Sequence, residues 1–460
     1  MSNFTPTIGL EIHVELKTKT KMFCNSVNNP DEKRPNVNIC PICLGHPGTL
    51  PTINKEAVKH VLRVGLALGG QLADYTEFER KNYFYPDIPK GYQISQYKYP
   101  LVTGGSLAEV ALTRIHLEED TGRLQHDSKS GFSFVDFNRA GVPLMELVTE
   151  PVITSAKQAA DFARELQLLL RYLAVSDADM EKGQMRVEAN ISIALAAPSL
   201  GTKVEIKNLN SFRSVERAIE YEIKRQSEVL GRGEQVMQET RGWDDIQRIT
   251  FSQREKESAH DYRYFPEPDL PPLKLSEIPE FQNLAQTLPE LPSAKRERYK
   301  KDFGIKDEDI EIYINNQSKA NEFESVMKIL GEKRLAKSAS NYILNEVKSS
   351  LPVSSVAGTI RLIDGYELSS RGAKELFKVL PEKEVDVRKF AEERGLIQKS
   401  DESMLVDVVE QVINANPKTV ADYRAGKAAA LQFLIGQGIK ESGGAANPTA
   451  LKKLFEKALK

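Results

Sequence analysis

The sequence lacks several features that would place a protein in a class at once. It has no run of about 18 apolar residues, so we predict no membrane-spanning helix. Its first residues, Met1–Pro6, show no basic segment followed by an apolar one, which argues against a secretory signal. It has only three cysteines, an odd number that cannot all pair within one chain. We therefore expect a reducing compartment, the cytoplasm.

The common nucleotide-binding and hydrolase signatures are also missing. We find no G-x-x-x-x-G-K-[ST], no Rossmann glycine fingerprint and no G-x-S-x-G elbow. The 63 Lys and Arg nearly balance the 65 Asp and Glu, so overall charge indicates no nucleic-acid partner. Charge is uneven, however, because residues 411–460 contain eight basic and three acidic residues. A basic C-terminal segment favours a polyanionic partner such as RNA, although a solvated helical surface explains it equally well.

Prolines divide the chain. Seven of the 23 fall between Pro266 and Pro292, where proline prevents regular helix and central strand and indicates an extended connector. We expect a first domain over residues 1–292, a helical domain over 293–400 and a small helical tail over 401–460. The fold class predicted is α+β, with a mainly antiparallel sheet and flanking helices in the first domain.

Alternation with period two predicts half-buried strands in the first domain. Residues 8–16, 185–193 and 203–207 each place apolar side chains on one face and polar ones on the other. Helical periodicity predicts helices over about 155–173 and from about Asn210 onward. These helices can cover the apolar face of the sheet and leave the polar face open.

The polar faces carry chemically active residues. Glu11 and His13 share one face of the first strand, about 7 Å apart, and can reach one metal ion together. Three consecutive carboxylates, Glu118–Asp120, repel one another unless a cation lies among them. Carboxylate oxygens with limited imidazole suit Mg²⁺ or Mn²⁺, and Mg²⁺ suits phosphate chemistry. A solvated face with salt bridges across the strands is the alternative for each motif.

Two further segments combine basic residues with other binding groups. Residues 80–97 interleave Arg and Lys with aromatics and can stack a base and hold phosphates, or can form a loop packed by its own aromatics. Lys207 and Asn208 end a strand just before a helix that Asn210 or Ser211 caps. A helix N-terminus beside lysine is a candidate anion site, although a cap without a ligand accounts for it as well.

The three cysteines have a spacing that permits a metal site. Cys24 precedes Cys40 and Cys43, which form a C-x-x-C pair. A tetrahedral zinc site needs a fourth ligand, and Ser26 stands where another cysteine is expected, with His46 as a substitute. Bound zinc and unligated thiols both remain open.

Long blocks of the sequence resemble one known family, the B subunits of the heterotrimeric tRNA-dependent amidotransferase. The blocks are IGLEIHVEL, RKNYFYPDIPKGYQISQY, IHLEEDTGRL, FNRAGVPLMELVTEP, EIKNLNSF, AHDYRYFPEPDLPP and NPKTVADYRAGKAAALQFLIGQGIK. The resemblance implies ATP-dependent phosphorylation of the side-chain carboxylate of Glu-tRNA(Gln) or Asp-tRNA(Asn). Ammonia from a glutaminase-type A subunit then forms the amide, in a complex with a small C subunit. The family fold implies a cradle-like sheet domain and a tail that grips the tRNA.

The resemblance also assigns roles to single residues. It implies a magnesium site made by Glu11, His13, Glu118, Glu119 and Glu188. Lys81 and Lys90 match lysines of the ammonia path and the active-site rim, beside the catalytic Glu118 and Glu119. Arg186, Lys207, Asn208 and Arg263 are candidates for phosphate or substrate contact.

The chain departs from the family pattern at two of these sites. Glu188 stands where the family has Asp, so one methylene shifts the carboxylate. The family zinc motif reads C-x-C, whereas this chain has Cys24-Asn25-Ser26. A tRNA-binding scaffold without catalysis is the alternative function. An aminoacyl-tRNA synthetase is disfavoured because HIGH and KMSKS signatures are absent.

Overall fold

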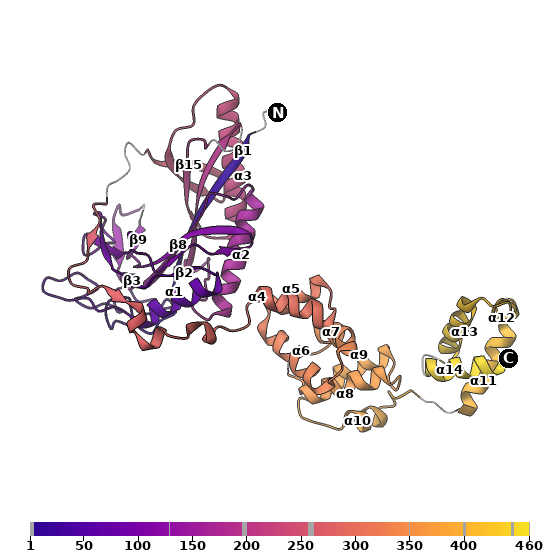
Figure 1. Cartoon of the computed structure of the whole chain (residues 1–460). Helices are drawn as coiled ribbons and strands as arrows, with labels where there is room; N and C mark the ends of the chain where they lie inside the picture. The colour runs from indigo at the N-terminus through magenta and orange to yellow at the C-terminus, as the bar shows by residue number, and fades with distance from the viewer. Residues whose placement is uncertain are drawn as a thin grey trace. The chain divides into compact units, whose positions relative to one another are not determined.

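The computed structural model describes residues 4–127, 129–195, 200–255, 262–348, 350–398, 402–442 and 446–459. The chain divides into two compact units between Leu291 and Pro292 (Figure 1). This division lies at the proline-rich connector. The domain boundary that we expected between residues 400 and 401 lies outside the described residues.

A ten-stranded sheet dominates the described part of the first unit, and its strands pair antiparallel except for β13 with β14. In spatial order the strands are β15 (Ile249–Glu255), β14 (Glu239–Asp244), β13 (Val204–Leu209), β12 (Met185–Ala194), β1 (Thr5–Glu15), β11 (Pro143–Thr149), β8 (Val110–Glu119), β6 (Val102–Thr103) and β2 (Gln71–Leu72), with β7 (Ser106–Leu107) also paired to β8. The smaller sheets pair β9 (Arg123–His126) with β10 (Ser133–Asp136), β4 (Glu79–Asn82) with β5 (Tyr92–Ser95) and β16 (Phe265–Pro266), and β3 (Tyr75–Thr76) with β17 (Leu273–Lys274).

One face of the large sheet is covered by helices, as the alternation predicts. These are α1 (Lys55–Ala67), α2 (Ala156–Tyr172) and α3 (Phe212–Gly231), of which α2 and α3 run along the sheet (Figure 1). The side chains of Ser155 and Ser211 cap α2 and α3 by accepting backbone N–H groups. Apolar residues of β1 and β12 pack with Phe162 of α2 and Val215 of α3 in one core. The opposite face of the sheet is left for polar residues.

The proline-rich connector packs on the first unit. Glu267 accepts two hydrogen bonds from the guanidinium of Arg80 at 2.7 and 2.8 Å. Leu270, Leu275 and Leu284 are buried in the core of the unit. The segment contains three short 3₁₀ helices, at Leu275–Glu277, Pro279–Phe281 and Leu284–Thr287. The connector therefore belongs to the first unit up to Leu291.

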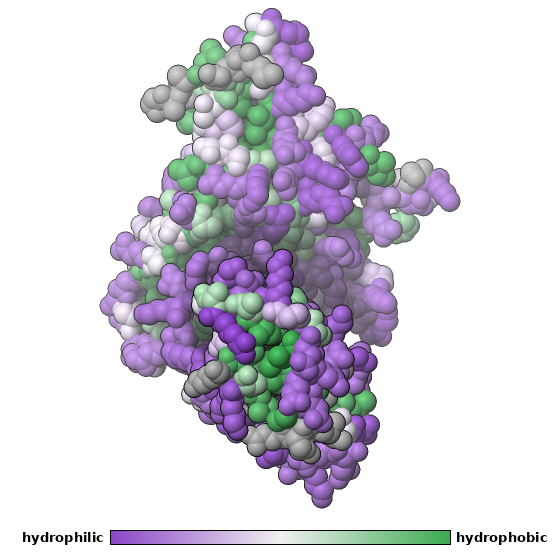
Figure 2. Space-filling model, turned by 90° about the vertical axis from the view of Figure 1, so that its right-hand side faces the viewer, coloured by the Kyte–Doolittle hydropathy of each residue, from purple (hydrophilic) through white to green (hydrophobic). Residues whose placement is uncertain are grey.

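The described part of the second unit is helical. Its helices are α4 (Pro292–Arg298), a π-helical turn (Tyr299–Phe303), α5 (Asp307–Asn315), α6 (Gln317–Leu330), a 3₁₀ turn (Lys333–Leu335), α7 (Ala336–Asn345), α8 (Val353–Asp364), α9 (Ser370–Val379), α10 (Val387–Glu393), α11 (Glu402–Ala415), α12 (Pro417–Arg424), α13 (Ala428–Glu441) and α14 (Pro448–Ala458). Helices α11 to α14 share a hydrophobic core that includes Leu405, Leu434 and Phe455. Figure 2 shows mostly hydrophilic side chains on the face it presents, with an apolar patch among them. In the described ranges no helix is long and apolar enough to cross a bilayer.

Phe162 tests the packing of α2 on the sheet. It is fully buried, and Phe162→Ala should lower the free energy of unfolding of the first unit by about 3–5 kcal/mol, because a cavity replaces the ring. Unfolding in urea is followed by the fluorescence of Trp243, the only tryptophan, which lies in the first unit. Lys157→Ala on the exposed face of the same helix is the control and should cost less than about 0.5 kcal/mol. Equal losses in both variants would contradict the packing described.

Candidate active site

A polar cavity lies on the face of the sheet that the helices leave open. Its volume is roughly 810 Å³. Strands β1, β8, β11, β12 and β13 form its floor, and Lys81 of β4 with the aromatic residues Tyr83, Tyr97, Tyr262 and Tyr264 lines it as well. Of the polar faces singled out in the sequence, Glu11 and His13 of β1 and Arg186 and Glu188 of β12 line this cavity.

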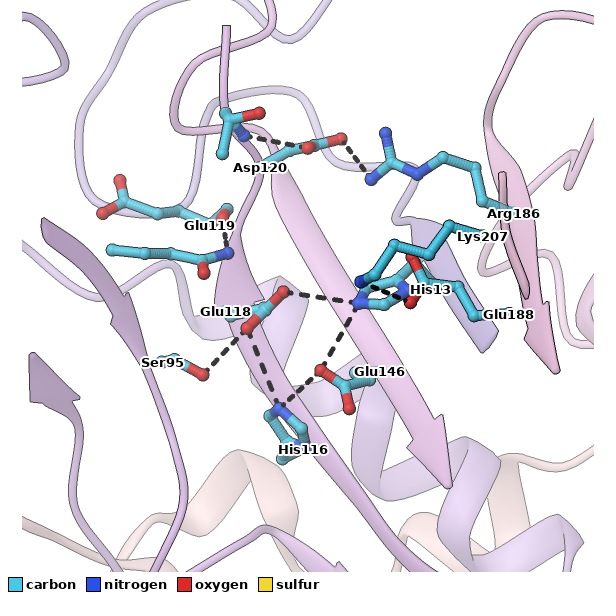
Figure 3. Close-up of polar contacts among 12 residues, drawn as sticks. His13, Ser95, His116, Glu118, Glu119, Asp120, Glu146, Arg186, Glu188 and Lys207 are labelled. Carbon is cyan, nitrogen blue, oxygen red and sulfur yellow. Dashed lines mark hydrogen bonds and ion pairs between the residues drawn. The ribbon is translucent and has the colours of Figure 1, made fainter. Parts of the chain in front are cut away.

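Strand register brings two histidines and two glutamates together in the cavity (Figure 3). Glu146 of β11 lies opposite His13 on one side and His116 on the other. Its carboxylate is 3.4 Å from Nε2 of His13 and 3.2 Å from Nε2 of His116. Glu118 lies two residues beyond His116 on the same face and approaches the two imidazoles at 3.9 and 3.8 Å. We call these four residues the histidine cluster.

Opposite charges keep the histidine cluster stable. Burial lowers the pKa of His116, but Glu146 and Glu118 raise it more, to about 9. Burial likewise lowers the pKa of His13, which Glu146 raises above its ordinary value. The pKa of Glu146 is raised by burial but held well below its usual range by the two imidazoles. The imidazoles thus hold protons that a divalent cation can replace, because a metal-bound imidazole is neutral.

A second group of carboxylates, the glutamate cluster, lies across β1, β12 and β13. It consists of Glu11, Glu188 and Glu205, each of which places one carboxylate oxygen within 4.8 Å of the others. Glu11 and Glu188 stand directly opposite in the register, a pairing of like charges that is unfavourable without a cation. Lys207 supplies one positive charge, with Nζ 2.8 Å from Glu188 and 3.6 Å from Glu205.

An unpaired polar atom adjoins the glutamate cluster. The amide nitrogen of Asn190 donates to Glu11 at 2.8 Å, while its amide oxygen is buried without a partner in the described part of the chain. A buried oxygen of this kind can serve a cation. The glutamate cluster offers three carboxylates, and His13, Glu118 and Glu146 of the histidine cluster offer two carboxylates and one imidazole within 4.8 Å of one another. These donor sets fit Mg²⁺ or Mn²⁺.

Basic side chains surround the two clusters. Burial lowers the pKa of Lys81, but Glu118 and Glu146 raise it more, so its ammonium is charged. Arg186 pairs with Asp120 at 3.0 Å (Figure 3). Burial raises the pKa of Asp120, whereas Arg186 and Arg139 lower it, to about 2. Basic side chains that line the cavity can bind phosphate oxygens. There are six of them: Lys81, Arg114, Arg139, Arg186, Lys203 and Lys207.

Glu119 does not join Glu118, contrary to the expectation that both ligate one metal. Neighbouring residues on a strand point to opposite faces, and Figure 3 shows Glu119 directed away from the histidine cluster. Its carboxylate accepts from the ammonium of Lys90 at 2.5 Å and from the backbone N–H of Ile94 at 2.9 Å. Lys90 and Glu119 line a smaller cavity, together with Cys43 and Gly141.

Of the two remaining residues expected at the site, Asn208 lines the large cavity and Arg263 does not. Asn208 lines the large cavity at the end of β13, in a left-handed backbone conformation with φ of 58°. Arg263 is exposed and is not among the residues that line that cavity; its backbone carbonyl accepts from the amide of Asn82 at 2.9 Å. The structure thus supports a site position for Asn208 and not for Arg263.

Two carboxylates of the site, Glu146 and Glu205, were missed in the sequence. Glu146 is a single charge in the apolar run PLMELVT of β11, and it is 6% exposed. A buried carboxylate in an apolar strand requires a partner, and this signal could have identified it. The partners themselves come from strand pairing, which the sequence does not provide.

The cysteines lie together, as their spacing permits, but the groups around them do not suit zinc. Sulfur atoms of Cys24, Cys40 and Cys43 are within 4.8 Å of one another. The ammonium of Lys21 lies 3.7 Å from the sulfur of Cys43, and the hydroxyl of Ser26 lies 3.9 Å from the same sulfur. Among the described residues neither His46 nor another histidine joins the three cysteines. An ammonium against a ligand sulfur repels Zn²⁺, and structural zinc takes four nitrogen or sulfur ligands. The donor set therefore does not fit structural zinc.

Comparisons with known proteins cover nearly the whole chain. Residues 6–279 match the family model of the GatB/GatE catalytic domain, and residues 321–459 match that of the GatB domain. The chain is similar to proteins named as the B subunits of aspartyl/glutamyl-tRNA(Asn/Gln) amidotransferases. The relative from Persephonella marina is 43% identical over 99% of this chain and 100% of its own length. Those from Thermotoga maritima and Thermomicrobium roseum are 42% and 44% identical, with 99% of both chains covered.

The residues of the candidate site lie in the part of the chain that matches the catalytic-domain model. Every residue of the histidine and glutamate clusters falls within residues 6–279, in the part that matches the catalytic domain. Both matches run in the expected order along the chain, and the full-length similarity is well above 30%. The chain therefore belongs to the GatB family, with a GatB/GatE catalytic domain followed by a GatB domain.

Proposed function

We propose that this chain activates the side-chain carboxylate of Glu on tRNA(Gln), or of Asp on tRNA(Asn), by phosphorylation with ATP, so that ammonia can form the amide. Membership of the GatB family supports the reaction class, and the names of the relatives supply the substrates. The observation that carries the proposal is the pairing of two carboxylate clusters with six cationic side chains in one cavity. This is the environment that phosphoryl transfer requires.

The chemistry explains the need for such a site. A free carboxylate is a poor acyl donor, because its leaving group would be an oxide. Phosphorylation forms a C–O–P linkage and turns that oxygen into a good leaving group, which ammonia then displaces. The site must hold two anions, the carboxylate and the triphosphate, close together, and it can do so only if their charge is neutralised.

The carboxylate clusters are the candidate cation sites. His13, Glu118 and Glu146 would hold one Mg²⁺, and Glu11, Glu188 and Glu205 could hold another. A bound cation would neutralise charge on the phosphate oxygens. The chain's own residues fix these ligands: Ser95 donates to Glu118 at 2.8 Å, and Thr240 donates to Glu205 at 2.7 Å. Such contacts orient metal ligands and keep them ionised.

The basic side chains are the candidate phosphate contacts. Lys81 and Lys207 project ammonium groups into the cavity from different strands, and Arg186 presents a guanidinium suited to two oxygens at once. Tyr97 and Tyr264, stacked at 4.8 Å between ring centroids, offer an aromatic surface for a nucleobase. Because the chain has no Walker motif, these groups replace a phosphate loop in the proposed site.

The amidation step requires partners. The relatives are named as one subunit of an amidotransferase, which implies a complex of several chains. We propose a glutaminase-type A subunit and a small C subunit as its other members. Ammonia would arrive from the A subunit. Lys90 and Glu119 are the candidates for the ammonia path because they line a smaller cavity that shares Asp120 and Thr121 with the large one.

A scaffold that binds tRNA without catalysis is the second candidate. Such a protein would gain nothing from burying carboxylates, which cost free energy unless they are compensated. The histidine cluster keeps Glu118 and Glu146 at 2% and 6% exposure. Retention of both clusters favours the catalytic function. We further propose that the last four helices, α11 to α14, grip the tRNA away from its aminoacylated end.

Removal of one imidazole tests the catalytic function. His13→Ala should lower ATP-dependent phosphorylation of Glu-tRNA(Gln) by at least about 100-fold, since the cluster loses a cation ligand. The assay follows ADP release that depends on the aminoacylated tRNA, with uncharged tRNA as the blank. Glu220→Gln, on the exposed face of α3, is the matched control and should retain full activity. Equal rates for wild type and His13→Ala would leave the scaffold as the better candidate.

Glu118 and Glu119 should differ in cation binding although they are neighbours. Glu118→Gln should weaken Mn²⁺ binding about 10- to 100-fold, because it removes a charge from the histidine cluster. Glu119→Gln should leave Mn²⁺ affinity within about twofold, since Glu119 faces the other cavity. Titration of the purified chain with Mn²⁺, followed by electron paramagnetic resonance, measures both. Comparable losses of Mn²⁺ affinity in the two variants would mean that the Glu119 side chain also points toward the histidine cluster.

The lysines of α14 test the proposed tRNA contact. Lys452 and Lys453 are exposed, and their replacement by Gln should weaken tRNA binding at low salt. The slope of log K against log salt should fall by about 0.7–0.9 per lost phosphate contact. Replacement of Lys301 and Lys328, exposed in the same unit but outside the tail, removes the same charge and is the control. A slope that changes equally in both pairs would argue against a role for the tail.

A further inference from the structure

The cysteine cluster has a geometry that neither the proposed reaction nor a zinc site explains. Cys24 lies in a tight hairpin closed by the Thr20–Val27 bridge. Cys40 and Cys43 lie in a turn in which the N–H of Cys40 donates to the sulfur of Cys43 at 3.1 Å. Both Cys24 and Cys43 are buried, at 7% and 4% exposure, and all three cysteines are free thiols.

Lys21 is the unusual member of this cluster. It is fully buried, and its ammonium donates to the sulfur of Cys43 and, at 3.2 Å, to the carbonyl of Phe137. A buried ammonium needs an anionic or strongly polar partner. Cys43 is the one sulfur that it contacts among the described residues, so Lys21 occupies the position of the positive charge that a metal would otherwise supply.

The position of Cys43 connects the cluster to the second cavity. Cys43 lines the same small cavity as Lys90 and Glu119. A methyl group placed on Gly45, whose φ is +68°, would lie 2.6 Å from Cγ of Lys90. The turn that carries Cys43 therefore packs directly on Lys90, and Cys43 is among the residues that a small neutral oxidant would meet in this cavity.

We propose that Cys24 and Cys43 form a reversible disulfide on exposure to peroxide, with Cys43 reacting first, and that Lys21 rather than zinc supports the sulfur of Cys43. The cluster is thus an oxidation site beside Lys90 and Glu119. Cytoplasmic disulfides of this kind are transient and act in redox sensing. Formation of the bond draws the Cys43 turn toward Cys24 and disturbs its packing on Lys90.

The reaction balances with one peroxide. The Cys43 sulfur, as thiolate, attacks one oxygen of hydrogen peroxide, the O–O bond breaks, and a sulfenic acid and hydroxide form. The Cys24 thiol then attacks the sulfenyl sulfur, the S–O bond breaks and the S–S bond forms. The proton of Cys24 leaves with the departing hydroxide as water. The two sulfurs lose two electrons, which reduce the peroxide.

The test uses the full-length reduced chain, purified without chelator and treated with hydrogen peroxide. Thiols titrated after unfolding should fall from the three of the reduced chain to one. Non-reducing peptide mapping should join the peptides of Cys24 and Cys43, and dithiothreitol should reverse the change. Elemental analysis should find far less than one zinc per chain. One tightly bound zinc per chain, or a bond between Cys40 and Cys43, would overturn the proposal.

Variants separate the roles within the cluster. Cys40→Ser is the matched control and should still form the Cys24–Cys43 bond at an unchanged rate. Cys24→Ser should stop at the sulfenic acid of Cys43, which a dimedone probe captures. Lys21→Met should slow oxidation of Cys43 about tenfold. Because Lys21 is buried, the wild-type rate is also compared with that of the urea-unfolded chain, and a folded chain that reacts no faster would refute the role of Lys21.

Discussion

The pairing of β1 with its two neighbours is the constraint on which the rest of the site depends. With β1 between β11 and β12, His13 must face Glu146, and Glu11 must face Glu188. A shift of one residue would turn these side chains into the apolar core, and the core residues of β1 into the cavity. Because Ile8, Leu10, Ile12 and Val14 are completely buried, the hydrophobic effect fixes this register. Apolar packing on one face therefore holds acidic groups together on the other.

The closeness of the carboxylates determines which groups surround them. Glu11 opposite Glu188 and Glu118 near Glu146 repel one another at low dielectric. The chain compensates with imidazoles in one cluster and with Lys207 in the other. The positive charge of the histidine cluster is carried by imidazole protons, which can be lost. That of the glutamate cluster is carried by Lys207, which Glu188 and Glu205 share. Such a site can release its imidazole protons when a metal binds and can transfer the lysine contact to a phosphate. A rigid structural ion pair would do neither.

Local patterns in the sequence predicted the strands and the polar face, because side-chain direction follows from the backbone of the same segment. Alternation in residues 8–16 and 185–193 placed Glu11, His13, Arg186 and Glu188 correctly on the cavity side. Glu146 and Glu205 were missed, since their importance comes from pairing between distant strands. Glu119 was misplaced for a different reason. The run HLEED was treated as one acidic group, although the side-chain alternation that was used for β1 would have placed Glu118 and Glu119 on opposite faces of β8. Arg263 was carried over from a motif, and no geometric argument placed it.

The separation of Glu118 from Glu119 gives β8 a structural role. One side of its last residues faces the histidine cluster, and the other faces the cavity of Lys90, Glu119 and Cys43. If phosphorylation occurs in the large cavity and ammonia approaches through the small one, this single strand divides them. Water must be kept from the acyl phosphate while ammonia is admitted. The ion pair of Lys90 and Glu119 lies on the small-cavity side of this strand, where ammonia on that route would meet it before reaching the large cavity.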